Sequence, residues 1–422
     1  MKHKRVRSCA VICSVSLLAC IINVALGQDP AAQEVNGTLS EIDGVRVLRV
    51  WGSPQERGFA HGYLVGEDFT QLINGFIESG KFMDVDGYEN DLLLRLKLMK
   101  VPHKYEVELR GLLSGMEARA GGPVTVPILG RSLQYKDVVA ANCMGDLLRM
   151  GCSSFAAWGS MTADGHTLTG RNMDWPSCPA LEGNQVVIVR TPSAGGKELG
   201  WVSVFWPGLI GCTTGMNSEG VTVGMHDSNH PDAPMIRTRD CIPSTLLYRA
   251  AIESAQARTA TGDISRVLGE YHTYHGYNMM VSWPYEGSGA AAVVFEHDAD
   301  RNRDGGMTIR KPGTSNAFVV CTNHFRKRYE PLQGIRFSRL RSGLGRLAGA
   351  QGSRHLTTKR AWNMLGSVPI EGIVTHHSVI FEPNTQLMRV AFAQNGQNAP
   401  HCDKVILDVT KLLAGDYPGG KK

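Results

Sequence analysis

The sequence lacks several features that mark common classes of protein. After residue 26 no stretch is long and uncharged enough to span a membrane. No block of like charges stands out, and the formal net charge is only +5 over 422 residues, so nucleic acid is a poor candidate partner. Neither Cys-x-x-Cys nor His-Glu-x-x-His occurs, which argues against a metal site of familiar spacing. We therefore expect no metal and no cofactor.

The first 27 residues have the pattern of a secretory signal. The basic run Met1–Arg7 precedes an apolar stretch that ends in small residues just before Gln28. This pattern predicts a signal peptide over residues 1–27 and a secreted or periplasmic protein. A retained membrane anchor is one alternative, because the stretch is near the lower length limit for a span. Lipoprotein anchoring at Cys20 is a minor alternative, weakened by the apolar residues that follow that cysteine.

The number of cysteines after the predicted signal is odd. In an exported protein an odd thiol suggests a reactive cysteine. The remaining six could form disulfides or stay as buried free thiols, and their spacing does not decide between the two. The seven are Cys143, Cys152, Cys178, Cys212, Cys241, Cys321 and Cys402.

The spacing of apolar residues changes near residue 152. Before it, Phe69, Leu72, Ile73, Phe76 and Ile77 repeat at helical spacing, so residues 28–151 are expected to be mostly helical. In residues 152–422, short strand-like runs separated by tight turns dominate, and short connections favour antiparallel pairing. Strands are expected at 153–158, 166–170, 185–190, 201–206, 220–225, 277–283, 291–296, 317–321, 378–381, 387–393 and 404–407, and helices near 243–256 and 335–347.

Cys152 stands out among the cysteines because of its neighbours. Gly151 precedes it, a strand-like run follows it, and an Arg-x-x-Asp pattern, Arg171 to Asp174, comes with the next strand. A cut between Gly151 and Cys152 would give the thiol its own α-amine as a general base. The unperturbed pKa values of a thiol and an α-amine are close, about 8.5 and about 7.7–8.0, which suits proton exchange near neutral pH. The pattern predicts a nucleophile made by self-cleavage.

Each of these residues also has an ordinary interpretation. A lone cysteine in a strand is most often structural and buried. Arg171 could lower the pKa of the thiol by its charge, and Asp174 could hold the α-ammonium, but the two could also form a surface ion pair. The combined spacing favours the catalytic interpretation.

The motifs along the chain resemble those of a known family. They are similar to segments of the autoproteolytic acyltransferase/hydrolase family, the cysteine N-terminal nucleophile hydrolases that include isopenicillin-N acyltransferase. Acid ceramidase, N-acylethanolamine amidase and the choloylglycine (bile-salt) hydrolases look like more distant relatives. The resemblance covers most of the chain after residue 27. The segments that carry it are Gly52–Gly62, Glu108–Met116, Gly151–Cys152, Gly170–Asp174, Gly215–Gly220, Thr322–Phe325 and Ser378–Pro383.

The resemblance implies a fold and the main catalytic roles. It implies an α+β fold, a four-layer αββα sandwich, and cleavage between Gly151 and Cys152 into pieces 28–151 and 152–422 that remain associated. Cys152 would be the nucleophile and its α-amine the base. Arg171 and Asp174 would shape the charge around it. Asn323 would donate a side-chain N–H to the oxyanion, although an asparagine there could also simply end a strand.

Three further residues receive supporting roles. Arg336 matches a later arginine of the family, with Arg339 as a possible substitute, but an arginine on a helix is usually solvated. His226 stands where the family often has an asparagine whose backbone N–H points at the oxyanion. Trp175 could line an acyl pocket, although aromatic residues in strands are usually core.

The expected function is hydrolysis, or acyl transfer, at a linear amide with an apolar acyl group, through a thioester acyl-enzyme. The expected partner is this small-molecule amide, with no stable membrane insertion after signal removal. Two alternatives stay open. One is a secreted binding protein that has kept the fold and lost the chemistry, and the other is an exported thiol peptidase with a separate histidine base. The sequence does not identify the amide.

Overall fold

The structure is a computed structural model that describes residues 34–148, 150–228, 230–233, 240–313, 317–348, 355–368 and 372–417. The predicted signal peptide over residues 1–27 and the alternative anchor site at Cys20 lie outside these ranges. Val35–Lys422 form one compact unit. Within the described ranges, no helix is both long and apolar enough to cross a bilayer.

The larger of two main sheets has nine strands. In spatial order they are β1 (Gly37–Ile42), β2 (Val45–Gly52), β7 (Val186–Pro192), β8 (Trp201–Phe205), β9 (Thr214–Asn217), β10 (Thr222–Asp227), β11 (Tyr277–Ser282), β12 (Ala292–His297) and β13 (Met307–Arg310). Neighbours pair antiparallel except β2 and β7, which run parallel with Val47 opposite Val187. Strands from the segment before residue 152 therefore extend the sheet built by the segment after it.

The second main sheet has six strands, and all of its neighbours pair antiparallel. In spatial order they are β14 (Phe318–Thr322), β5 (Gly151–Ala157), β6 (Leu168–Trp175), β15 (Val374–Glu382), β16 (Leu387–Phe392) and β17 (Val405–Asp408). The predicted nucleophile thus begins an interior strand, between β14 and β6.

The two sheets pack face to face through apolar side chains. Val187 and Val202 of the nine-stranded sheet belong to the same buried cluster as Val379 and Met388 of the six-stranded sheet. A second cluster between the sheets contains residues of β5, β11, β12 and β14. Alternation along each strand leaves the opposite face of each sheet for helices.

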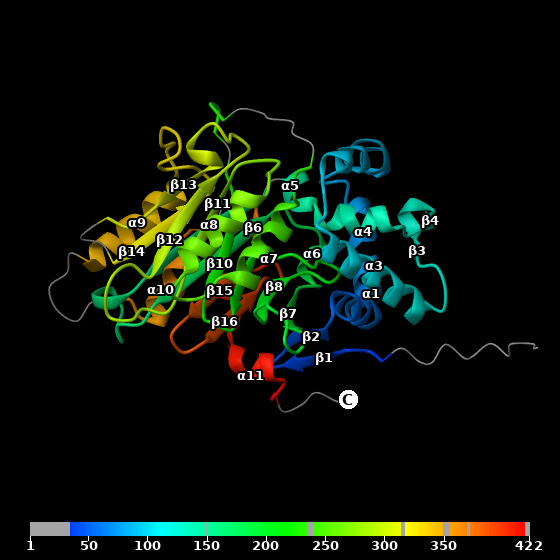
Figure 1. The fold of residues 1–422 in the computed structure, drawn as a ribbon, viewed down its shortest axis with the longest axis horizontal. Coiled ribbons are helices and arrows are strands. Elements are labelled where there is room, and N and C mark those ends of the chain that lie inside the picture. Colours follow the sequence, from blue (N-terminus) through cyan, green and yellow to red (C-terminus); the bar gives the residue numbers. More distant parts are fainter. Residues whose placement is uncertain are drawn as a thin grey trace, which may run out of the picture. The chain divides into compact units, whose positions relative to one another are not determined.

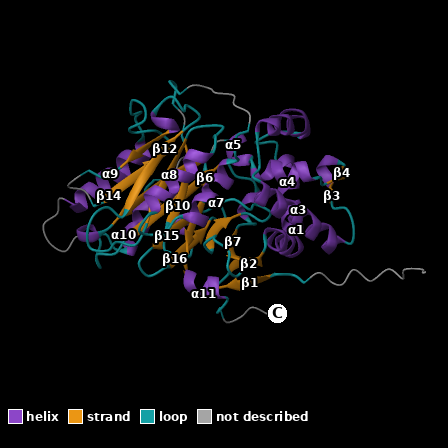
Figure 2. Cartoon of the chain, viewed as in Figure 1, coloured by secondary structure: helices purple, strands orange, loops and turns teal. Residues whose placement is uncertain are grey.

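Helices cover both outer faces (Figures 1 and 2). The nine-stranded sheet shares its outer core with α1 (Pro54–Glu78), α3 (His103–Ala120), α7 (Ser244–Ser254) and α8 (Ala260–Glu270). The six-stranded sheet shares its outer core with α9 (Ile335–Ala348) and α10 (Thr358–Gly366). These four layers confirm the expected αββα sandwich.

Shorter elements complete the described fold. They are η1 (Gly87–Leu92), α2 (Leu93–Arg95), η2 (Leu96–Leu98), β3 (Thr125–Val126), η3 (Pro127–Leu129), β4 (Arg131–Ser132), α4 (Tyr135–Asn142), α5 (Met144–Leu147), η4 (Gly159–Met161), α6 (Pro179–Glu182), η5 (Asp304–Gly306), η6 (Ala399–His401) and α11 (Val409–Ala414).

Helices α1 and α3 approach each other closely because glycines line the contact. A Cβ atom added at Gly58 would collide with the carbonyl oxygen of Glu108, and one added at Gly115 would collide with the backbone of α1. Ser53 caps α1 within a capping box, so the first turn of this helix is fixed. The close approach places Glu108 beside that first turn, which carries Arg57.

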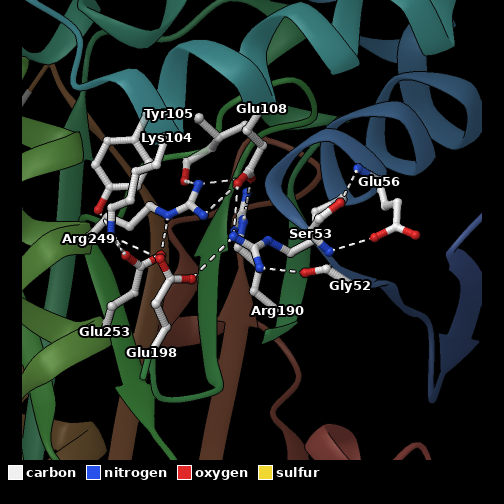
Figure 3. A network of polar contacts seen from close by, with 12 residues as sticks. Gly52, Ser53, Glu56, Lys104, Tyr105, Glu108, Arg190, Glu198, Arg249 and Glu253 are labelled. Atoms are coloured by element: carbon white, nitrogen blue, oxygen red, sulfur yellow. Dashed lines mark hydrogen bonds and ion pairs between the residues drawn. The ribbon is translucent and has the colours of Figure 1, made fainter. Parts of the chain in front are cut away.

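A buried network of charges joins α3 to the rest of the fold (Figure 3). Glu108 accepts hydrogen bonds from Arg249 at 2.8 and 2.6 Å, and Arg57 Nη2 lies 3.4 Å from it. Arg190 Nε lies 3.6 Å from the same carboxylate, and Arg249 also pairs with Glu253 at 2.6 Å. Arg57 and Glu108 precede residue 152 and the other three follow it, so the network connects the two predicted pieces.

The expected strands are present with shifted ends. The run expected at 166–170 continues as β6 to Trp175, so that Arg171 and Asp174 lie within a strand. β1 and β2 were not expected, because they lie in the segment whose other apolar residues repeat at helical spacing. β9 was not expected as a strand, since it is four residues long and contains a glycine, which weakens the strand signal.

Candidate active site

Cys152 lies at the start of β5, paired in register with Met173 of β6, and its exposed fraction is 1%. Side chains alternate along a strand. Cys152 therefore shares a face with Ala156, which packs between the two sheets. Gly151 and its register partner Asp174 belong to the opposite face, toward α9. The bond expected to be cut thus joins the first residue of β5, Gly151, to the first residue whose side chain points between the sheets, Cys152.

Arg171 places a cation beside the thiol. Its Nη2 donates to Cys152 Sγ at 3.3 Å, and its Nε donates to the hydroxyl of Thr214 at 2.6 Å. Burial raises the pKa of the Cys152 thiol, and the charge of Arg171 acts in the opposite direction. Arg171 and Asp174 are both buried, so the alternative of a surface ion pair is wrong.

Asn323 directly follows β14 and contacts the backbone on both sides of Gly151. Its Oδ1 accepts the backbone N–H of Cys152 at 2.6 Å, and its Nδ2 donates to the carbonyl of Met150 at 2.9 Å. Nδ2 also donates to the carbonyl of Asp227 at 2.7 Å. The side chain therefore spans the bond expected to be cut. In the uncut chain the two side-chain N–H groups of Asn323 donate to the carbonyls of Met150 and Asp227. One of these carbonyls must move away before Asn323 can donate to an oxyanion.

Asp174, which is buried, and Arg336, which is partly buried, form an ion pair next to Asn323. Arg336 Nη1 donates to Asp174 Oδ2 at 2.8 Å, and Arg336 Nη2 donates to Asn323 Oδ1 at 2.7 Å. The Thr375 hydroxyl donates to Asp174 Oδ1 at 2.6 Å. Burial raises the pKa of Asp174, and Arg336 opposes this effect. Arg336 is therefore no solvated helix arginine, whereas Arg339 donates to a backbone carbonyl at an exposed position.

The side chain of His226 contacts Arg171 as well as backbone carbonyls. Its Nε2 lies 2.7 Å from Ser154 Oγ and 3.3 Å from Arg171 Nη1, while its Nδ1 faces the carbonyls of Gly224 and Asn278 at 3.1 and 3.3 Å. These partners fit a neutral imidazole that is protonated on Nδ1 and accepts at Nε2. Burial, together with the charge of Arg171, holds the pKa of His226 well below its usual value. The imidazole thus helps to orient Arg171.

An apolar cavity adjoins the expected cleavage segment. Met150, whose carbonyl contacts Asn323, lines it together with Trp175. Trp206 also lines it, and the indole N–H of this residue is satisfied by the carbonyl of Leu181 at 2.7 Å. The walls therefore present mainly carbon atoms. The other lining residues are Phe69, Leu72, Ile73, Phe76, Ile77, Tyr88, Ala141, Met144, Gly145, Leu181, Phe205, Leu209 and Thr245.

The structure brings the expected site residues together. Hydrogen bonds connect Arg171 to Cys152 and Cys152 to Asn323, and Arg336 joins Asn323 to Asp174. The supporting groups Thr214 and Thr375 were not predicted from the sequence. Their only signal was a polar residue within an apolar strand. Within the described ranges, no group of three or more His, Cys, Asp or Glu side chains is arranged to hold a metal ion.

Residues 160–355 match the family model described as acyl-coenzyme A:6-aminopenicillanic acid acyl-transferase. The family resemblance is confirmed. The segment that matches the acyl-transferase model contains Arg171, Asp174, His226, Asn323 and Arg336. It begins after Cys152.

Curated relatives and solved structures give weaker likenesses. An uncharacterized protein of Archaeoglobus fulgidus is 25% identical over 360 residues, which cover 73% of this chain and 56% of that protein. Protein dcd1B of Dictyostelium discoideum is 27% identical over 201 residues, or 44% of this chain and 40% of that protein. The chain thus spans about half the length of the curated relatives it matches. A Caenorhabditis elegans N-acylethanolamine-hydrolyzing acid amidase ortholog gives a TM-score of 0.42 at 18% identity, covering 61% of this chain and 100% of that one.

Proposed function

We propose that the protein is a self-cleaving amidohydrolase or acyltransferase of the N-terminal nucleophile type, with Cys152 as its nucleophile. The observation that carries this proposal is the pair of contacts at Cys152. Arg171 donates to its sulfur at 3.3 Å, and Asn323 accepts from its backbone nitrogen at 2.6 Å. A cation favours the thiolate, which is the nucleophilic form, and the nitrogen that would become the catalytic amine already has an acceptor. The match to the acyl-transferase model supports the reaction class.

Maturation begins when the thiolate of Cys152 attacks the carbonyl carbon of Gly151. A C–S bond forms, the C–N peptide bond breaks, and the leaving nitrogen takes up one proton, which balances the proton that the thiol lost when it became a thiolate. Water then hydrolyses the thioester, which leaves a carboxylate on Gly151 and a free thiol and α-amine on Cys152. Asn323 holds the backbone on both sides of this bond, and such restraint favours reaction by fixing the reacting groups.

Turnover repeats this chemistry on an external amide. The α-amine of Cys152 accepts the thiol proton as the sulfur attacks, and it returns the proton to the leaving amine. The acyl group remains as a thioester until water or another acceptor takes it. Movement of the cut end that carries Met150 removes one acceptor from Asn323 Nδ2. That N–H then becomes available to the oxyanion of the substrate.

An apolar acyl group is the proposed specificity. The cavity beside Met150 is lined by aromatic and aliphatic side chains, with Trp175 reaching it from the strand that also carries Arg171. Transfer of an acyl chain from water to such a surface is favourable in proportion to the apolar area buried. The substrate that we propose is therefore a small linear amide with an apolar acyl group.

We further propose that the two pieces stay associated after cleavage, as an exported protein. The network around Glu108 supports the association, because removal of one member would leave other buried charges unpaired. Shared sheet pairing of β2 with β7 acts in the same direction. Export rests on the sequence pattern of residues 1–27 alone.

The two alternatives have less support. A thiol peptidase would need a histidine that accepts the thiol proton, but His226 interacts with Arg171 and Ser154. A binding protein without chemistry would have no need for a buried arginine at the sulfur of Cys152, since burying charge is costly.

The activity can be tested with a panel of N-acyl amino acids, acyl-ethanolamides, bile-salt conjugates and penicillins. Wild-type protein should release the amine from at least one class, and Cys152→Ala should release none. Equal release by the two proteins would contradict the proposal, because the reaction would then proceed without the thiol.

A further inference from the structure

A row of three polar side chains crosses the nine-stranded sheet beside the proposed site. His226 of β10 lies opposite Asn278 of β11, and Asn278 lies opposite Glu296 of β12. Residues directly opposite each other share a face of the sheet, and this face is the one toward the six-stranded sheet, because Met280 on the same face packs between the sheets. All three are fully buried. Buried polar groups need partners. The side-chain N–H groups of Asn278 and the carboxylate of Glu296 find theirs on the loop that carries Asn323.

Asn278 ties down the backbone around Asn323. Its Nδ2 donates to the carbonyl of Thr322 at 2.9 Å and to the carbonyl of His324 at 3.0 Å. These residues are the immediate neighbours of Asn323 in the chain. The side chain of Asn278 therefore fixes the backbone on both sides of Asn323. It thereby also fixes the direction in which the Asn323 side chain points.

Glu296 holds the loop that continues from Asn323. Its carboxylate accepts the backbone N–H groups of residues 326–328 at 2.8 to 3.0 Å. Arg310 Nε also donates to it at 2.8 Å. The loop thus turns around a buried carboxylate before it reaches α9 and Arg336. Both ends of this loop supply site residues, because Arg336 in turn donates to Asn323.

We propose that Asn278 and Glu296 are positioning residues of the active site, which hold Asn323 in place against Cys152. They touch the loop backbone and act on the chemistry through Asn323. Displacement of a reacting or stabilising group by about 1 Å can cost about 10²-fold in rate. The kinetic consequence rests on the proposed function, whereas the placement of Asn323 can be observed without any activity.

Asn217 provides a matched control for Asn278. It is buried in β9 of the same sheet, and its Nδ2 also donates to two carbonyls, those of Ile252 and Ala255, both at 2.9 Å. These carbonyls lie at the end of α7 and just after it, and belong to no residue of the proposed site. A substitution at Asn217 therefore removes the same pair of donor contacts without releasing Asn323. It also removes the two hydrogen bonds that Asn217 Oδ1 accepts from the backbone N–H groups of Glu219 and Val221, both at 3.0 Å.

The test compares Asn278→Leu with Asn217→Leu by kinetics, thermal unfolding and crystallography. Asn278→Leu should slow single-turnover acylation by about 10²-fold with KM changed little, and Asn323 should move away from the Cys152 nitrogen. Asn217→Leu should lower Tm by at least as much and leave kcat unchanged. Glu296→Gln, which keeps one acceptor oxygen, should lose less activity than Glu296→Leu. If Asn278→Leu does not fold, Asn278→Ala replaces it.

Two results would overturn the inference. One is an Asn278 variant in which Asn323 keeps its place beside Cys152. The other is loss of kcat in the Asn217 variant as large as in the Asn278 variant, which would make both effects structural. A wild-type protein that neither cleaves itself nor hydrolyses amides would contradict the proposed function instead, and the crystal structure of the variant would still decide the placement of Asn323.

Discussion

Arg336 Nη2 donates to Asn323 Oδ1 at 2.7 Å, which links the first turn of α9 to the end of β14. The same oxygen accepts the backbone N–H of Cys152. Because this atom accepts from two donors, it must be the amide oxygen and not the amide nitrogen. The N–H groups of Asn323 must therefore point to the carbonyls of Met150 and Asp227. Once the cut end that carries Met150 has moved away, one of these N–H groups is free and already oriented, so little reorganisation is needed when negative charge develops next to it.

Replacing Asn323 by alanine should therefore slow both reactions at Cys152. Loss of one oxyanion donor typically costs about 10²–10³ in rate, or roughly 3–4 kcal/mol of barrier. We expect kcat of the matured fraction to fall by about that factor and KM to change much less, because the bond strengthens as charge develops. Single-turnover kinetics on the matured fraction measure this. An unchanged kcat would make Asn323 a structural strand-end residue.

Arg171 should set the pH at which the thiol reacts. Arg171→Gln removes the only charge that donates a hydrogen bond to the sulfur among the described contacts, so the pKa of Cys152 should rise further. Because the thiolate forms only above that pKa, the pH profile of alkylation by iodoacetamide should shift to higher pH. Arg171→Lys keeps the charge and should shift the profile less. Identical profiles for wild type and Arg171→Gln would refute the role.

Much of the fold followed from local patterns. Short apolar runs bounded by turns predicted most strands of both sheets, because a strand buried on both faces is short and apolar along its whole length. β1 and β2 were missed although Asp43-Gly44 forms a tight hairpin turn between them, because the apolar residues that follow repeat at helical spacing. The parallel pairing of β2 with β7 leaves no turn in the sequence. The layer order came from the family resemblance, because periodicity does not show which sheet face meets which helix.

The site was predictable only where a motif carried it. Cys152, Arg171 and Asp174 lie on two neighbouring strands, so their proximity follows from one hairpin. The roles of Asn278 and Glu296 depend on the register of three strands and a distant loop, which no local pattern encodes. The orientation of the Asn323 side chain was not predicted either, since its contact with Met150 exists only in the folded chain.

Glu108 should hold the two pieces together. In an uncut Cys152→Ala background, Glu108→Gln should lower the free energy of unfolding by about 3–5 kcal/mol, because it leaves buried arginines without a counter-charge. Glu106→Gln on the same helix is the control, since the Glu106–Arg110 pair is partly exposed and worth at most about 1 kcal/mol. Chemical denaturation measures both. Equal losses in the two variants would contradict the role of the network.

The loss of unfolding free energy caused by Glu108→Gln depends on pH through the pKa of the Glu108 carboxyl. Burial opposes ionisation of Glu108, but Arg249 and Arg57 hold its pKa well below the usual range. Its stabilisation is thus fully present above the unfolded value of about 4.3 and is lost as pH falls from there toward the folded pKa. The difference in the free energy of unfolding between the Cys152→Ala protein and its Glu108→Gln variant should therefore stay constant from about pH 7 to about pH 5 and shrink only below the unfolded value.

His61 should make the fold less stable in acid. Its Nε2 accepts the backbone N–H of Gly208 at 2.8 Å, and burial, helped by the charge of Arg190, lowers its pKa to about 3. Its contribution is complete above about pH 6.5 and falls by about 1.4 kcal/mol per pH unit below that value. In the uncut Cys152→Ala background, His61→Gln keeps an acceptor without titrating, and should flatten the dependence between about pH 6.5 and about pH 5. His103→Gln, at an exposed position, should leave it unchanged, and a slope unaffected by His61→Gln would be inconsistent with a buried neutral imidazole.

The intact mass of the purified protein tests the central claim most directly. Wild-type protein should give two masses, which correspond to a piece that ends at Gly151 and a piece that begins at Cys152 with a free α-amine. Cys152→Ala should give one uncut chain, and Cys152→Ser should cut slowly, because a hydroxyl is the weaker nucleophile. A wild-type protein that remains a single uncut chain and hydrolyses amides at full rate would contradict the account.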